Sequence, residues 1–512
     1  MQAYGFSVQA YGFSAQADDS PRSRPIFHAI RQIPAQVVGF TARNRRFAFD
    51  HNDWLVITPD GLFDGTSPAY SQILWRFSAE LRDIAPVEAF FGDFFYPNLL
   101  SDLMRGKRPK ASQSMAQKDR RQPVIALQLA GAATGRNVDV SVQVTDAPAG
   151  AQDVRLFRNG SLVKVWHGDV LGGKTQSDLK TSLPIVAGEN RLTAYAFNRD
   201  NVKSADATLL VQGAASLQRK GVAYVLAAGV NSYANKDFDL NYAVADAASF
   251  GAEWKKQQEK LGTFARVEVT SLTDDQATKS NFLKALGELA SKVTPEDAVV
   301  IYFAGHGTAH DNRFYLIPHD LGFAAGRDAI DAEGLKSILV HSVSDLELEE
   351  AIEKIDAGQL LMVIDACNSG QALESEEKRR GPMNSKGLAQ LAYEKGMYIL
   401  TAAQSYQAAQ EASKFGHGFL TFALVEEGIE QNKADDEPAD GSVMVREWLD
   451  FATRRVPQLQ VELMKDQSSR GVTVAFVKGD EQIADPAKNV QRPQVFYRRE
   501  VEAQPLVVAR PK

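Results

Sequence analysis

The chain has 512 residues, of which 44% are apolar and 24% are charged, values typical of a globular protein. Its net charge of −7 offers no electrostatic basis for binding nucleic acid or an anionic membrane surface. One cysteine cannot form an internal disulfide, and no apolar run reaches the roughly 18 residues of a membrane span. We therefore expect no nucleic-acid partner, no membrane span and a cytoplasmic location.

The first 104 residues are predicted to form a tail and a small folded region. The hexapeptide QAYGFS occurs at 2–7 and again at 9–14, and we interpret residues 1–40 as a flexible tail. Residues 41–104 combine strand-like pieces with helical spacing over 71–84, which predicts a small α+β region. Its cluster of aromatic residues is interpreted as core packing rather than as a ligand site.

The middle of the chain changes from a polar stretch to short strands. Residues 105–122 are polar and basic and predict a linker, because no aromatic residues are interleaved as a nucleic-acid patch would require. Over 123–213 apolar and polar residues alternate, as at 138–144, and Asn159-Gly160 marks a hairpin turn. About seven short strands predict an immunoglobulin-like β-sandwich, here without a cysteine pair. We expect this sandwich to offer a surface for a protein partner.

From residue 218 to residue 480 predicted strands and helices alternate, which is typical of one doubly wound α/β domain with a mostly parallel sheet. The predicted strands are 222–230, 267–272, 298–307, 359–370 and 397–402, and the predicted helices are 241–256, 278–293, 344–355, 418–429 and 445–456. Ser344 and Glu347 have the spacing of a capping box. Residues 481–512 are interpreted as a C-terminal extension outside this domain.

Two of these apolar runs carry a chemically reactive residue. AVVIYFAGHG (298–307) delivers His306 between two glycines, and QLLMVIDACNSG (359–370) carries Cys367, the single cysteine. Continuous apolarity is typical of central parallel strands, whose carboxyl ends form ligand sites. We expect the thiol and the imidazole to lie side by side as nucleophile and base, with the N–H of Gly307 as an oxyanion donor. Taken separately, an inert buried thiol and a structural histidine are the ordinary alternatives.

The motif pair YFAGHG and DACNSG resembles the signatures of caspase-like cysteine peptidases, of the bacterial metacaspase or orthocaspase type in peptidase family C14. The order Asp-x-Cys-x-Ser-Gly around Cys367 is similar to that of metacaspases, with Asn368 where a histidine is usual. It differs from the Gln-Ala-Cys-Arg-Gly of true caspases. The resemblance covers roughly residues 220–430 and implies a caspase-like fold with a Cys–His dyad that hydrolyses peptide bonds.

The resemblance also implies a substrate pocket. Metacaspases line the S1 pocket, which holds the P1 side chain before the cleaved bond, with two aspartates that match Asp365 and Asp246. Two carboxylates favour Arg or Lys at P1, so we expect protein or peptide substrates with a basic P1 residue. For Asp246, a charge on a helix surface is the alternative. Many metacaspases use calcium, but Asp311, Asp320 and Glu374 form no readable motif; we expect no required cofactor and leave calcium open.

The stretch after the nucleophile is the last candidate feature. Residues 371–388 are charged, and Gly381-Pro382 interrupts any helix. In caspase-like peptidases the segment between the large and small subunits lies here, which makes Arg379, Arg380 and Lys386 candidates for self-cleavage. A solvated surface loop is the alternative. The competing function for the whole chain is a catalytically silent caspase-like module that binds or scaffolds partners.

Overall fold

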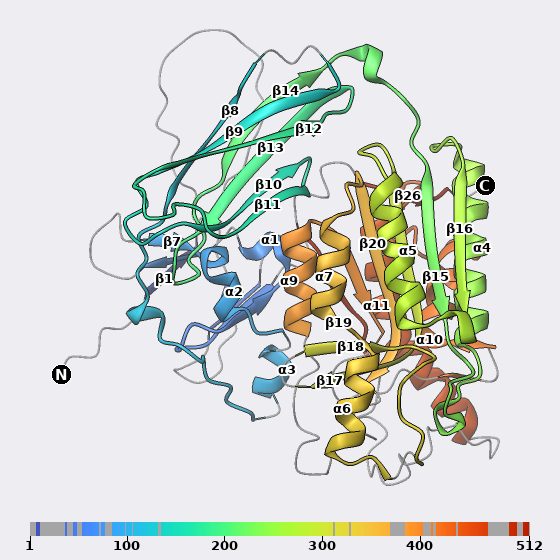
Figure 1. Cartoon of the computed structure of the whole chain (residues 1–512). Helices are drawn as coiled ribbons and strands as arrows, with labels where there is room; N and C mark the ends of the chain where they lie inside the picture. Colours follow the sequence, from blue (N-terminus) through green and yellow to red (C-terminus); the bar gives the residue numbers. More distant parts are fainter. Residues whose placement is uncertain are drawn as a thin grey trace.

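The computed structural model describes residues 7–10, 36–37, 45–48, 54–70, 73–76, 84–97, 99–104, 106–131, 135–310, 313–326, 329–368, 385–402, 411–412, 416–436, 439–468, 491–498 and 505–510. Three regions follow one another: a small N-terminal region, a pair of antiparallel sheets and an α/β domain (Figure 1). Across the described residues, no helix has both the length and the apolar character needed to cross a membrane.

The α/β domain is built on one mostly parallel sheet with the strand order β16-β15-β17-β20-β21-β25. The bounds are β15 Ala223–Gly229, β16 Val267–Thr273, β17 Ala298–His310, β20 Gln359–Asn368, β21 Tyr398–Thr401 and β25 Gln494–Phe496. β25 alone of these runs antiparallel to its neighbour. β18 (Arg313–Ile317) folds back onto the end of β17 and also pairs with β19 (Val343–Ser344). The predicted doubly wound, mostly parallel sheet is confirmed.

Helices cover both faces of this sheet and create two apolar cores (Figure 1). One face carries α4 (Ala243–Leu261), α10 (Phe419–Phe422), the π-helix η8 (Ala423–Glu430) and α11 (Val445–Ser468). The other carries α5 (Lys279–Lys292), α6 (Ala332–His341), α7 (Asp345–Glu353) and α9 (Ser385–Lys395). Successive residues of β17 alternate between the two cores, Tyr302 in the first and Phe303 in the second. A strand buried on both faces needs the continuous apolar run that its sequence has. The predicted capping box of α7 is present.

The α/β domain extends past the predicted boundary at residue 480. β25 lies at the edge of its sheet, and β26 (Val507–Ala509) pairs with β24 (Val443–Met444). Gln258 of α4 donates hydrogen bonds to the carbonyls of Val507 and Val508. The interpretation of 481–512 as an extension outside the domain is therefore wrong for these residues. Strands of three residues are too short for periodicity to reveal.

Residues 124–213 form two antiparallel sheets, here called the two-sheet region. Its strands are β8 Val124–Leu129, β9 Asn137–Thr145, β10 Gln152–Arg158, β11 Ser161–Asp169, β12 Ser177–Pro184, β13 Gly188–Phe197 and β14 Ala207–Gly213. One sheet has the order β12-β9-β8 and the other β11-β10-β13-β14. Alternate residues such as Val140, Leu156 and Leu192 form the core shared by both sheets. Asn159 and Gly160 have positive φ, as their predicted hairpin turn requires.

The N-terminal region departs most from the sequence predictions. Its strands are β1 Ser7–Ala10, β2 Gln36–Val37, β3 Arg45–Ala48, β4 Trp54–Ile57, β5 Phe63–Gly65, β6 Ile73–Arg76 and β7 Ile84–Pro86, and its helices are α1 Ser67–Tyr70, α2 Phe91–Phe94 and α3 Leu99–Met104. A strand, β6, occupies residues 73–76 near the start of the predicted helix at 71–84, and β7 begins at its last residue. β1 pairs with β6, so the flexible-tail interpretation is wrong for β1. Short apolar runs fit either helix or strand, and the pairing partner decides between them.

The second half of the predicted linker is packed against the neighbouring regions. Lys118 donates to Asp93 Oδ2 at 2.7 Å and to the carbonyl of Asp200 at 2.6 Å. Met115 is buried in the core of the N-terminal region, and Asn198 donates to the carbonyl of Asp119. The linker prediction is therefore wrong for residues 115–119, whereas residues 106–114 are mostly exposed. Polar composition indicates a solvated chain only when the polar groups lack partners elsewhere in the fold.

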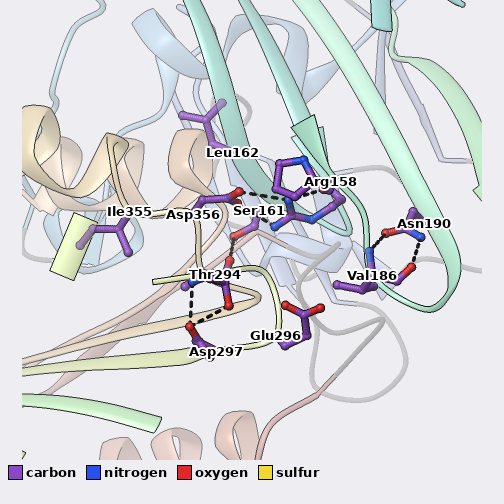
Figure 2. A network of polar contacts seen from close by, with 12 residues as sticks. Arg158, Ser161, Leu162, Val186, Asn190, Thr294, Glu296, Asp297, Ile355 and Asp356 are labelled. Atoms are coloured by element: carbon purple, nitrogen blue, oxygen red, sulfur yellow. Dashed lines mark hydrogen bonds and ion pairs between the residues drawn. The ribbon is translucent and has the colours of Figure 1, made fainter. Parts of the chain in front are cut away.

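Buried ion pairs hold the two-sheet region against the α/β domain. The Arg158 guanidinium, 1% exposed, lies 2.7 Å from Asp356, as Figure 2 shows. Arg155 lies 2.6 Å from Glu394 of α9. The next residue of α9, Lys395, donates to the carbonyls of Leu162, Glu353 and Ile355. Charged groups buried in this way require their partners, so the two regions pack as one body.

Candidate active site

The parallel pairing of β17 and β20 places His306 opposite Cys367. The register runs without a shift from Ala298 opposite Gln359 to Gly307 opposite Asn368. Both strands therefore end at the same edge of the sheet, where parallel α/β sheets carry their ligand sites. The two residues are neighbours, as the sequence predicts. The structure describes the backbone of Cys367, and the side chain lies outside the described part.

His306 is held by the segment that follows β15. Its side chain is almost fully buried, and Nε2 lies 2.8 Å from the carbonyl oxygen of Phe238. A carbonyl only accepts, so Nε2 carries the hydrogen, and Nδ1 is the basic atom of the neutral ring. The backbone N–H of His306 donates to the Tyr233 hydroxyl at 2.8 Å, and the two rings lie 5.0 Å apart. These contacts set both the position and the tautomer of the imidazole.

Gly307 follows His306 and is paired on both sides. Its register partners are Asn368 in β20 and Leu316 in β18. It therefore lies at the same sheet edge as His306 and Cys367. Its service as an oxyanion donor stays a prediction.

The two predicted pocket carboxylates, Asp246 and Asp365, lie on either side of Gly418. A Cβ atom built on Gly418 would lie 3.1 Å from Oδ2 of Asp246 and 3.2 Å from Oδ2 of Asp365. Gly418 has φ −62° and ψ 152°, a conformation that any residue adopts, so glycine is needed here for space. The tertiary structure thus brings together two acids from α4 and β20.

Asp246 lies in the first turn of α4 and is 3% exposed, so the alternative of a helix-surface charge is wrong. His417 of β23 (His417–Gly418) places Nδ1 2.8 Å from Oδ1 of Asp246, and the N–H of Gly418 lies 3.2 Å from both carboxylate oxygens. Burial raises the pKa of Asp246, and the bonds from His417 and Gly418 oppose that rise. The hydrogen bond to Asp246 in turn raises the pKa of His417 above its ordinary value.

Asp365, 8% exposed, is bound by hydroxyl groups. Thr421 of α10 donates to Oδ2 at 2.9 Å, and Tyr302 of β17 donates to the same oxygen at 3.4 Å. Burial and the nearby carboxylates of Asp365 and Asp246 raise the pKa of Tyr302, which therefore stays a neutral donor. The two carboxylates thus differ in kind: a histidine binds one and hydroxyl groups bind the other.

A family model described as the caspase domain matches residues 221–491, more than half of the chain. The chain belongs to the caspase-domain family. Metacaspase-1B of Aspergillus terreus is 24% identical over 235 residues, covering 42% of this chain and 56% of that protein. Metacaspase-1A of Neurospora crassa is 25% identical over 234 residues, covering 41% and 47%. The chain spans about half the length of the curated relatives it matches. These matches confirm the resemblance to caspase-like cysteine peptidases.

The similarity of this caspase-domain chain to solved structures is low. One solved protein from Geobacter sulfurreducens covers 57% of this chain and 94% of its own, at 16% identity and a TM-score of 0.33. A score that low does not support an inference about fold or function.

Sequence reasoning missed several residues of this caspase-domain site. The Phe238 carbonyl and Tyr233 lie in a segment without a motif, and a contact made by a backbone carbonyl leaves no side-chain signal. His417 had a signal, because Gly-His-Gly occurs at 416–418 as well as at 305–307. Thr421 and Tyr302 look like ordinary core residues until the fold brings them to Asp365.

Of the three acids considered as calcium ligands, only Asp320 lies in the described part of the chain. Among the residues that the structure describes, no group of three or more His, Cys, Asp or Glu side chains could hold a metal ion. Asp311 and Glu374 lie outside the described residues, and Asp320 accepts a hydrogen bond from the backbone of Lys279. The described residues therefore do not fit a calcium ion.

The candidate self-cleavage residues divide into two groups. Arg379 and Arg380 lie outside the described residues. Lys386 lies in the first turn of α9, which begins at Ser385, so the predicted loop to residue 388 is too long. Leu388, Leu391 and Ala392 are buried at helical spacing and explain why the helix starts early.

Proposed function

We propose that this caspase-domain chain is a cysteine endopeptidase that cleaves after Arg or Lys. The observation that carries the proposal is the register pairing of His306 with Cys367 at the carboxyl edge of the sheet. A nucleophile and a base on adjacent strands of a rigid sheet are held in fixed relation, which is what covalent catalysis requires. Family membership over residues 221–491 supports the same reaction.

The hydrogen bond to Phe238 assigns the roles of the two ring nitrogens. Nδ1 of His306 accepts the proton of the Cys367 thiol, and the thiolate attacks the carbonyl carbon of the scissile bond. The imidazolium then gives this proton to the departing amine. Water, deprotonated by the same nitrogen, hydrolyses the thioester and releases Cys367. Backbone N–H groups near Gly307 are the proposed donors to the oxyanion.

Preference for a basic P1 residue is supported by the two carboxylates beside Gly418. A guanidinium or ammonium group can donate charge-assisted hydrogen bonds to the carboxylates of Asp246 and Asp365, whereas both carboxylates would repel an acidic side chain. A cation reaching both acids must enter a site where Asp246 is already bound by His417.

Peptides that differ only at P1 test the proposal. We expect cleavage after Arg and Lys and none after Asp, measured with and without calcium. Cys367→Ala and His306→Ala should each lower turnover by roughly a thousandfold or more while the circular dichroism spectrum is retained. His341→Ala, a change on α6, is the matched control and should keep full turnover.

The other outcomes of this assay are equally informative. Cleavage after Asp would refute the assigned pocket. If no peptide is cleaved and a thiol-directed probe does not label Cys367, the chain is a silent binding or scaffold module. Hydrolysis of small esters without hydrolysis of basic peptides would indicate a different cysteine hydrolase.

We also propose that the chain cuts itself after Arg379 or Arg380, with Lys386 less accessible because a helical turn must first unwind. Basic residues in a charged stretch beside the nucleophile suit the proposed pocket. Purified wild type should contain fragments of about 42 and 14 kDa, at about 110 Da per residue, and Cys367→Ala should stay intact by mass spectrometry. A wild type that cuts basic peptides yet stays full length contradicts self-cleavage.

We further propose that the two-sheet region has an immunoglobulin-like fold and binds a protein partner. About seven antiparallel strands around one core support the type, and pull-down with the full chain tests the role. A cytoplasmic location remains our expectation from the single cysteine, and cell fractionation tests it.

A further inference from the structure

His417 makes a contact with Asp246 that the proposed reaction does not use. The hairpin of β22 (Glu411–Ala412) and β23 carries His417 to the N-terminus of α4. There Nδ1 lies 2.8 Å from Oδ1 of Asp246, and the two side chains are 15% and 5% exposed. A carboxylate buried to this extent is costly unless it is paired. His417 therefore lies where a cation entering the pocket would meet Asp246.

The neighbouring carboxylate, Asp365, has different hydrogen-bond partners. Asp365 accepts hydrogen bonds from the hydroxyl groups of Thr421 and Tyr302. Both of these donors are neutral hydroxyl groups. Both acids lie close to the same point beside Gly418. His417 makes its hydrogen bond with Asp246, and its charge also interacts with the more distant Asp365.

We propose that His417 is a specificity-determining residue of the S1 pocket: its imidazolium neutralises Asp246 in the substrate-free chain, and a guanidinium or ammonium group at P1 displaces it. The inference rests on the proposed preference for a basic P1 residue. A substrate cation gains both carboxylates only by releasing His417 from Asp246. Recognition of P1 is therefore coupled to the protonation of this histidine.

The groups around His417 set the direction of this coupling. Asp246 faces it from α4, Asp365 from β20 and Glu426 from η8, and all three raise its pKa, with the hydrogen bond to Asp246 the largest cause. Tyr302 of β17 is a neutral hydroxyl that donates to Asp365, and α10 (Phe419–Phe422) has no titratable side chain. Glu411 of β22 is the register partner of Gly418. The free chain therefore holds a proton on His417 to a higher pH than an isolated histidine does. A bound cation expels that proton.

The alternative is that His417 only clamps β23 to α4. A clamp would affect stability, but it would not link cation binding to proton release. Benzamidine, whose amidinium group imitates the end of a P1 arginine, separates the two roles. The full-length Cys367→Ala chain is used, so that ionisation of the thiol does not enter the measurement.

The experiment is calorimetric titration of benzamidine between about pH 6 and pH 9, in two buffers of different ionisation enthalpy. We expect the affinity to rise with pH, by at most about tenfold per pH unit, with release of up to one proton per bound amidinium. His417→Gln should abolish both the proton release and the rise. His167→Gln removes another histidine–carboxylate pair, with Glu353 at 3.3 Å, and should change neither.

A second measurement does not depend on a variant that folds. The resonance of His417 in the otherwise unsubstituted Cys367→Ala chain should titrate at lower pH when benzamidine saturates the site. If the affinity is independent of pH, or the titration of His417 is unchanged by benzamidine, His417 is a clamp and the inference is overturned. If benzamidine does not bind at any pH and basic peptides are not cleaved, the proposed pocket itself fails.

Discussion

His306 depends on two groups from the segment after β15, the Phe238 carbonyl and the Tyr233 hydroxyl. The carbonyl sets the tautomer, and the hydroxyl accepts the backbone N–H of His306 and donates to the Ile317 carbonyl at 3.4 Å. Tyr233 therefore connects β17 to β18 beside His306, the proposed base. Contacts that position a base affect turnover, because a small displacement of the base lowers the catalytic rate.

Tyr233→Phe removes the hydroxyl group and keeps the ring. We expect the free energy of unfolding to fall by about 1–3 kcal/mol, since a buried amide loses this acceptor. Turnover should fall more than KM changes, because the substrate pocket is untouched. Tyr224→Phe, at the opposite end of β15, is the control for ring packing. Equal turnover in the two variants would exclude a positioning role for Tyr233.

Gly418→Ala tests the space between the two carboxylates. The added methyl would lie 3.1 and 3.2 Å from their oxygens, so Asp246 and Asp365 must separate. We expect a loss of about 1–3 kcal/mol in stability, typical of overpacking, and a raised KM for peptides with Arg at P1. Gly287→Ala in α5 has open space around it and should stabilise the helix by up to about 1 kcal/mol. An unchanged KM in Gly418→Ala would contradict the shared pocket.

Among the elements, α9 connects the regions of the chain. Phe91 of the N-terminal region stacks on Tyr393 with ring centroids 4.5 Å apart, and Arg155 of β10 pairs with Glu394. Lys395 donates to three carbonyls, one of them from the two-sheet region. Residues 393–395 of this one helix thus contact both the N-terminal region and the two-sheet region.

Lys395 gives α9 a measurable dependence on pH. Burial is the largest cause that lowers its pKa, to about 8. The unfolded lysine keeps its proton to about pH 10.4, so between these values the unfolded state binds more protons and stability rises with pH. We expect the free energy of unfolding of wild type relative to Lys395→Met to rise by about 1–2 kcal/mol from about pH 7.5 to 9.5. Urea unfolding at each pH gives these values, and a difference that does not change with pH would contradict the lowered pKa of Lys395.

At the scale of the whole molecule, the two-sheet region packs with the α/β domain as one folded body. Arg155 and Arg158 bury their charges against Glu394 and Asp356 of the α/β domain, and Arg136 pairs with Glu296 at 2.7 Å (Figure 2 shows the Arg158 contact). A partner-binding module joined by a free linker would not need buried charges at its base. Partner binding by this region would therefore act on a surface fixed relative to the active site.

Arg155 and Glu394 allow that interface to be tested in a double-mutant cycle. Arg155→Met alone should cost about 3–5 kcal/mol, because Glu394 keeps a buried charge without its cation. Adding Glu394→Met should restore much of the loss, since a buried pair and an apolar pair are nearly equal in stability. Urea unfolding of the full chain gives both values. Independent, additive effects would show that the two residues do not interact across the interface.

What the sequence determined by itself is local. Apolar periodicity and strand length predicted β15, β16, β17, β20 and β21, and the residues at the strand ends identified His306 and Cys367. The capping box of α7 and the turn at Asn159-Gly160 were predictable for the same reason. Each depends on residues a few positions apart, whose spacing matches the geometry of one element.

Only the tertiary structure decided the contacts between distant segments. The pairing of β1 with β6, the position of β25 and the packing of Lys118 have no periodic signal, because their partners lie far away in the chain. The same is true of the Phe238 carbonyl on His306 and of His417 on Asp246. Buried polar groups find partners wherever the fold places them, and that placement is a property of the packed chain as a whole.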